Sequence, residues 1–147
     1  MTPRQELDRF IAKFSPDTAR KARAALKKMR AMLPGANQLV YDNYNALAIG
    51  FAGGDRASQI ALSIAVYPRW VSLFLMHGPA LDDPKGLLKG GGSTVRHIVL
   101  EPVSLLDSKD VKALIWQAVA RCEPAIPKQG RGGVVIKSVS KKQRPRH

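Results

Sequence analysis

Cysteine, acidic side chains, aromatic residues and long apolar runs are all scarce in this chain. Its single cysteine, Cys122, excludes an internal disulfide and a metal cluster held by several cysteines. No apolar run approaches the roughly 20 residues of a membrane-spanning helix, and the N-terminus lacks the apolar segment of a secretory signal. We therefore expect a cytoplasmic protein without a membrane partner.

Because acids are few, the 147-residue chain is strongly basic, with 24 Lys or Arg against 11 Asp or Glu and a formal net charge of +13. The excess lies at the two ends. Residues 1–33 carry nine basic and three acidic side chains, residues 34–126 carry eight of each, and residues 127–147 carry seven basic side chains and no acid. Such asymmetry concerns partners and solubility rather than fold. It predicts an anionic partner, either a small molecule or an acidic macromolecule, or else a charge that serves only solubility.

Hydrophobic periodicity predicts two helices at the N-terminus and one near the C-terminus. The first two begin at Thr2-Pro3 and Ser15-Pro16, which pair a capping side chain with a proline in the first turn. From residue 38 the period changes to two, which predicts four strands joined by short turns and therefore paired antiparallel. A long loop over residues 77–93 and a further strand over residues 94–100 follow. We expect an α+β fold, in which an antiparallel sheet of about five strands packs with two N-terminal helices and one C-terminal helix.

The composition divides the chain into one domain over residues 1–126 and a basic C-terminal tail over residues 127–147. Within the tail, the apolar run Val134-Val135-Ile136 predicts a short edge strand. It could pair with the sheet of its own chain or with that of a second copy, which would make a homodimer.

The loops and strands of the central region are similar to those of a known family. The similarity is carried by Leu33–Ala36 with Tyr41–Tyr44, by Leu75–Leu88, and by Gly90 and Gly92 before Val95–Ile98. Together with the closing residues 135–146, these segments resemble the YdhG-like domain family over roughly residues 10–122 plus the tail. The resemblance implies a compact α+β sandwich. Some relatives carry the label of a frataxin-like iron chaperone, which would imply iron bound by surface carboxylates.

The residues themselves predict no metal site, no cofactor and no catalytic residue. Iron and other hard or borderline cations need clustered carboxylates or imidazoles. Asp82 and Asp83 form the only pair of adjacent acids, and they precede a proline, where we expect them to shape a turn. The histidines are isolated, and Cys122 lies on the apolar stripe of the last helix, which favours a core position. We expect a non-enzymatic binding module and disfavour the iron-chaperone role.

A glycine run at residues 90–92 suggests where a small anion could bind. Successive glycine amides can form an anion-binding nest, to which Lys89 and Arg96 would add charge. The alternative is that the glycine run has no ligand and forms a flexible, hairpin-like turn. A pocket for an anionic ligand would require the loops after two different strands to meet, and its residues would be Tyr41, Asn43, Tyr44, His77, Lys89 and Arg96.

The alternative function is nonspecific nucleic-acid binding through the second helix and the tail. Along one stripe of the helix, a positively charged side chain occurs about every 5 Å of the helix axis. The residues concerned are Arg20, Arg23, Lys27 and Arg30 on the helix and Lys141, Lys142, Arg144 and Arg146 in the tail. They would contact phosphates with a strong salt dependence. Since aromatic residues make up only 6% of the chain and no base-stacking motif is present, we expect weak binding without base readout.

Overall fold

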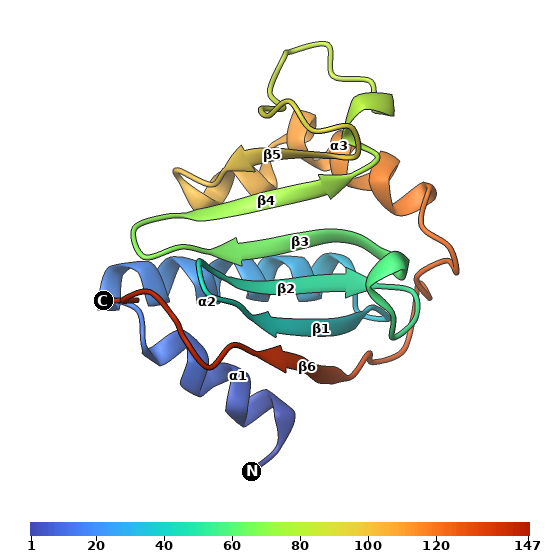
Figure 1. The fold of residues 1–147 in the computed structure, drawn as a ribbon. Helices are drawn as coiled ribbons and strands as arrows, with labels where there is room; N and C mark the ends of the chain where they lie inside the picture. The colour runs from blue at the N-terminus through green and yellow to red at the C-terminus, as the bar shows by residue number, and fades with distance from the viewer.

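Three helices cover one face of a six-stranded sheet in the computed structural model, which describes residues 1–147 (Figure 1). In chain order, the helices and strands are α1 (Pro3–Ala12), α2 (Pro16–Met32), β1 (Asn37–Asp42), β2 (Leu47–Ala52), β3 (Ile60–Val66), β4 (Val71–Met76), β5 (Val95–Val99), α3 (Lys109–Ala120) and β6 (Val134–Val139). The α+β class is confirmed, as is the expected order of two N-terminal helices, a sheet and a C-terminal helix.

Side-chain caps fix where the helices begin. Thr2 and Gln5 form a reciprocal capping box at the start of α1, in which Thr2 Oγ1 accepts from the Gln5 amide and Gln5 Oε1 accepts from the Thr2 amide. The Ser15 hydroxyl accepts from the Thr18 amide at the start of α2, and the Ser108 hydroxyl accepts from the Val111 amide at the start of α3. These caps satisfy amide donors that the first turn of a helix leaves without partners.

The strands β1 to β5 pair antiparallel with their neighbours in the chain. Short connections predict this pairing from β1 to β4, whereas residues 77–94 separate β4 from β5. A row of register partners crosses all five strands and is buried against the helices. Its residues are Val40, Ile49, Ile64, Leu73 and Ile98. The apolar side chains of α1, α2 and α3 pack on this face of the sheet, and Cys122, 6% exposed, joins the same core as expected.

The sheet is mixed rather than wholly antiparallel, because the tail supplies a sixth strand parallel to β1. After α3 the chain crosses from the β4 side of the sheet to the far edge and enters β6 in the direction of β1 (Figure 1). We call residues 121–133 the crossover. The predicted edge strand therefore exists and pairs within its own chain. Its direction depends on the path of the crossover, which a three-residue apolar run does not encode.

Two glycines allow the crossover to lie directly on the loop between α2 and β1. A Cβ atom at Gly35 would collide with the carbonyl oxygen of Pro127, and one at Gly132 with the carbonyl oxygen of Ala36. The Gly132 amide also donates to the carbonyl oxygen of Pro34 at 3.0 Å. Only glycine permits such close backbone approach. The crossover therefore packs against the end of α2 before the chain enters β6.

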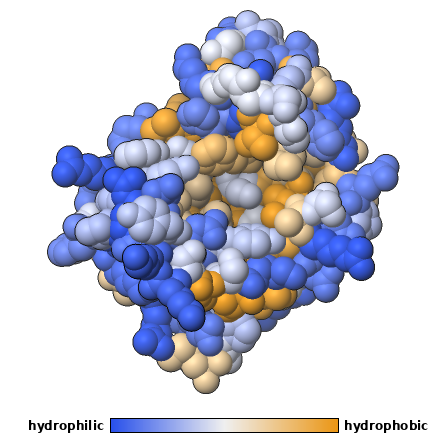
Figure 2. Space-filling model, viewed as in Figure 1, coloured by the Kyte–Doolittle hydropathy of each residue, from blue (hydrophilic) through white to orange (hydrophobic).

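The face of the sheet away from the helices carries an apolar hollow with a hydrophilic rim (Figure 2). Small side chains lie along it, and Ile60 covers Gly50 so closely that a Cβ there would meet its side chain. Phe74 and His97 are register partners on this face, with ring centroids 5.3 Å apart. None of the helices is long and apolar enough to cross a membrane.

Candidate functional site

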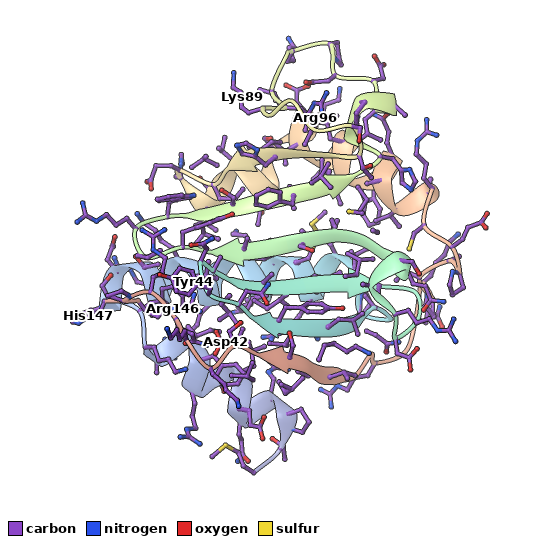
Figure 3. The ribbon with its side chains drawn as sticks, in the orientation of Figure 1. Asp42, Tyr44, Lys89, Arg96, Arg146 and His147 are labelled. Carbon is purple, nitrogen blue, oxygen red and sulfur yellow. The ribbon has the colours of Figure 1, made fainter.

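The six residues expected to form an anion pocket lie in two separate places. Figure 3 shows Tyr44 apart from Lys89 and Arg96. Tyr41, Asn43 and Tyr44 lie at the end of β1 and in the turn that follows, where Asp42 pairs with Leu47. In the sheet order, β1 is separated from β5 by three strands, which corresponds to about 19 Å at the usual strand spacing. The other three residues, His77, Lys89 and Arg96, follow β4 or lie next to and in β5. The single pocket that joins all six is therefore wrong.

The glycine run at residues 90–92 belongs to a hairpin-like turn. The backbones of Lys89 and His97 exchange two hydrogen bonds, of 2.8 and 2.9 Å. The Arg96 guanidinium donates to the carbonyl oxygens of Gly92 and Val95. Arg96 is thus bound to the backbone of its own turn, and Lys89 is exposed on the far side of the molecule from Tyr44 (Figure 3).

The side chain of Arg146 is buried in the fold and is not available to nucleic acid. It is 5% exposed, and its Nη2 donates to Asp42 Oδ1 at 3.0 Å and to the carbonyl oxygen of Asn43. The guanidinium carbon lies 5.2 Å from the centroid of the Phe14 ring, and Lys13 contacts the same carboxylate at 3.4 Å. Burial lowers the pKa of Arg146, and Asp42 opposes that shift. The expected phosphate contact at Arg146 is therefore wrong.

Of the other basic residues expected to contact nucleic acid, some form an ion pair within the protein and others do not. Arg20 forms an ion pair with Asp17, one turn earlier on α2. Arg23 and Lys27 are exposed and form no ion pair. The three remaining tail residues, Lys141, Lys142 and Arg144, are exposed. They lie near the β1–β2 turn, where the Arg144 amide donates to the Tyr44 carbonyl oxygen at 3.1 Å.

A different group of basic residues surrounds a cavity of about 640 Å³ between α1, α2 and the crossover. Arg4 comes from the first turn of α1, Arg30 from the last turn of α2, and Arg131 from the crossover. Gln38, the second residue of β1, forms part of the wall. We call this site the arginine pocket, defined by Arg4, Arg30, Gln38 and Arg131.

Gln38 orients the guanidinium of Arg30. Its Oε1 atom accepts a hydrogen bond of 2.7 Å from Arg30 Nε, and Gln38 itself is 6% exposed. The bond leaves Arg30 Nη1 and Nη2 without a protein partner. These groups are the donors that arginine uses to bind both oxygens of a carboxylate or phosphate at once. A half-buried arginine is therefore held by one nitrogen while its other donors remain free.

No ion pair neutralises the positive charge of the arginine pocket. None of its three arginines forms an ion pair, whereas Lys13, Arg20, Lys21, Lys28 and Arg146 all do. The pKa of Arg30 is lowered to about 10, mainly by burial and secondly by the positive charge of Arg4, while Asp8 opposes the shift. An anion placed beside Arg30 would reduce the repulsion between these like charges.

Sequence reasoning found one member of this pocket and missed the other three. Arg30 belongs to the predicted basic stripe, whereas Arg4, Gln38 and Arg131 attracted no functional hypothesis. The only available signal for Arg131 is its position between glycines, where a backbone can approach another closely. Its meeting with Arg30 depends on the crossover, which brings the tail back to the end of α2.

No three of the histidine, cysteine, aspartate and glutamate side chains lie close enough together to hold a metal ion. Comparison of the chain with protein-family models, curated proteins and solved structures finds no match. Membership of the YdhG-like family therefore stays a prediction, and functional inference depends on the geometry of the arginine pocket.

Proposed function

We propose that this protein is a cytoplasmic binding module for an anionic small molecule, which it holds in the arginine pocket. The observation that carries the proposal is the bond from Arg30 Nε to buried Gln38, which leaves the two Nη groups oriented and free. Arg4 and Arg131 add charge without a carboxylate partner. Preorganised donors of this kind bind oxyanions with little loss of side-chain entropy. Phosphate and carboxylate groups have the matching geometry.

Thermal unfolding with inorganic phosphate tests the proposal, with chloride at equal ionic strength as the reference. Phosphate at about ten times its Kd would stabilise the fold by about 1.4 kcal/mol, which corresponds to about 3–6 °C for a domain of this size. Arg30→Gln should remove the effect. Arg69→Gln is the matched control, because Arg69 is exposed and unpaired in the β3–β4 turn. An equal response of both variants would contradict the assignment.

Nonspecific nucleic-acid binding is the second candidate, favoured by the exposed and unpaired Arg23 and Lys27 on the helix that also carries Arg30. Fluorescence anisotropy with duplex DNA between about 50 and 200 mM salt measures it. Replacement of Arg23 and Lys27 by Gln should lower the salt slope by about 2 if both contact phosphates. Binding of DNA that survives this replacement would place the contact elsewhere.

A further inference from the structure

An apolar groove of about 490 Å³ lies between the last turn of α2, the helix α3 and residues 125–128. Met32, Leu33 and Pro34 form one side of it, and Trp116 and Val119 form the other. Trp116 is 47% exposed, the most exposed large apolar side chain of α3. The groove and the arginine pocket each have the size of a small-molecule site.

The groove and the arginine pocket are neighbours at the same end of the helix layer. Leu33 and Pro34 line both of them. The crossover also borders both, with Pro127 and Lys128 at the groove and residues 130–132 at the arginine pocket. A molecule held by Arg30 would reach the groove by passing over Pro34, which is exposed.

The charges along these two sites favour one kind of occupant. No acidic residue lines either of them, and the only charged residue of the groove is Lys128. The free donors of Arg30 select an oxyanion, whereas Trp116, Met32 and Val119 offer apolar surface that gains from removal of water. The arginine pocket alone suits a polar anion and the groove alone suits an apolar group, so only an amphipathic ligand can use both.

We propose that the ligand is an amphipathic anion, with a phosphate or carboxylate head in the arginine pocket and an alkyl body in the apolar groove. This inference rests on the proposed function and specifies the class of ligand for the same site. Head and body contribute separately. The head supplies charge-assisted hydrogen bonds to Arg30, and each methylene of the body that leaves water for the groove tightens binding by up to about fourfold.

The test is a chain-length series read by Trp116. The chain has two tryptophans, and Trp70 stacks on Tyr67 in the distant β3–β4 turn, with ring centroids 4.7 Å apart. In a Trp70→Phe background, inorganic phosphate, butyl phosphate, hexyl phosphate and octyl phosphate are titrated below micelle-forming concentrations. We expect Kd to fall by about two- to fourfold per methylene. Trp116 emission should shift to the blue with octyl phosphate and remain unchanged with inorganic phosphate.

Two groove variants locate the alkyl body. Ala120→Gln places a polar side chain in the groove, and Ala113→Gln makes the same change at another exposed alanine of α3, outside the groove. We expect Ala120→Gln to flatten the chain-length series and leave phosphate binding unchanged, while Ala113→Gln changes neither. If the dependence of Kd on chain length disappeared in both variants or in neither, the placement of the alkyl body in the groove would be overturned.

The failure of this inference is distinguishable from failure of the proposed function. Equal affinity for phosphate and octyl phosphate, without a Trp116 shift, would overturn the amphipathic ligand and leave the anion site intact. Binding of octyl glucoside as tight as that of octyl phosphate, unaffected by Arg30→Gln, would also overturn it, since the anionic head would then be irrelevant. Binding only of an acidic, leucine-rich peptide would assign the groove to a protein partner and overturn the small-molecule proposal. Absence of binding by every anion, phosphate included, would overturn both.

Discussion

Gln38 on β1 and Arg30 on α2 are joined by a hydrogen bond of 2.7 Å from Arg30 Nε to Gln38 Oε1. The bond couples the sheet to the helix layer at the edge of a cavity, and it fixes the plane of the guanidinium without neutralising its charge. A carboxylate at position 38 would satisfy Arg30 equally well as a hydrogen-bond acceptor. A neutral amide there keeps the positive charge available to a ligand.

Replacement of Gln38 is therefore expected to separate affinity from stability. Gln38→Met keeps the volume of the side chain but releases Arg30, so phosphate binding should weaken by about tenfold, or about 1.4 kcal/mol. Gln38→Glu should bind phosphate more weakly still, because its carboxylate would form an ion pair with Arg30 and neutralise the charge that binds the ligand. The same ion pair should keep the fold at least as stable as that of the unsubstituted protein. Calorimetric titration and thermal unfolding measure the two quantities. Tight phosphate binding by Gln38→Glu would rule out the assigned role of Arg30.

The pH dependence of anion binding follows from the lowered pKa of Arg30. This pKa is about 10 because burial, followed by the charge of Arg4, disfavours the protonated form. Binding of sulfate, which keeps its charge throughout, should be constant from pH 7 to about 9 and should weaken as the pH rises through 10 and Arg30 loses its proton. Circular dichroism at each pH verifies that the protein stays folded.

Arg4→Gln should move this midpoint upward, since it removes one of the two causes that lower the pKa of Arg30. The sign of the stability change follows from linkage. Below pH 10 Arg30 is charged in both the folded and the unfolded chain, so the folded state bears the whole repulsion from Arg4. Its removal should stabilise the fold by about 0.2–1 kcal/mol at pH 7, the range for partly exposed charges, while it weakens sulfate binding. A midpoint that does not move would exclude Arg4 as a neighbour that matters.

The tail is expected to contribute to stability through Arg146. Arg146→Met leaves Asp42, which is buried, with Lys13 alone at 3.4 Å. Because Lys13 remains as a partner of Asp42, we expect the free energy of unfolding to fall by about 2–3 kcal/mol. This loss lies near or below the lower end of the range for breaking a buried ion pair. Arg144→Met, two residues earlier and exposed, should change stability by less than about 0.5 kcal/mol. Urea unfolding compares the two, and an equal loss in both would mean that general charge, not this pair, stabilises the tail.

The double variant Asp42→Asn with Arg146→Met should recover part of that loss. Removing both charges abolishes the uncompensated carboxylate that the single variant leaves behind, and such replacements are often neutral. Urea unfolding of both single variants and the double variant completes the cycle and yields the coupling energy of the pair. Additive losses would contradict a direct interaction between Asp42 and Arg146.

The features that could be predicted from the sequence depend on interactions between residues close together in the chain. Thr2 and Ser15 cap the helices that their positions predict, and the alternation from Ile60 to Val66 becomes a buried strand. Antiparallel pairing follows from short turns, which are also local. The fold class was therefore accessible before the structure, along with the core position of Cys122.

The contacts of the candidate site could not be predicted because they join segments far apart in the chain. Nothing near Arg146 in the sequence indicates Asp42, which lies 104 residues away, in a region with equal numbers of acids and bases. On a helical wheel Arg30 belongs to the outward stripe, and only its packing beside β1 reveals the bond to Gln38. The expected pocket of Lys89 and Tyr44 failed for the related reason that the strand order places their loops apart.

Gly132 and Gly133 offer a matched test of how the crossover builds the site. A Cβ at Gly132 would collide with the carbonyl of Ala36, whereas one at Gly133 would meet no atom within 4 Å. Gly132→Ala should therefore force the crossover away from the loop after α2 and cost about 1–3 kcal/mol, as overpacking does. Gly133→Ala should change stability by less than about 0.5 kcal/mol.

The same pair of variants should separate in anion binding, because Arg131 precedes Gly132 in the wall of the arginine pocket. Displacement of the crossover in Gly132→Ala should weaken phosphate binding and speed hydrogen exchange of the amides that pair β6 with β1, while Gly133→Ala leaves both unchanged. Thermal titration and exchange mass spectrometry measure the two effects on one sample. If β6 exchanges faster in Gly132→Ala but phosphate binds as before, Arg131 is not part of the anion site, and Arg4 and Arg30 alone hold the ligand.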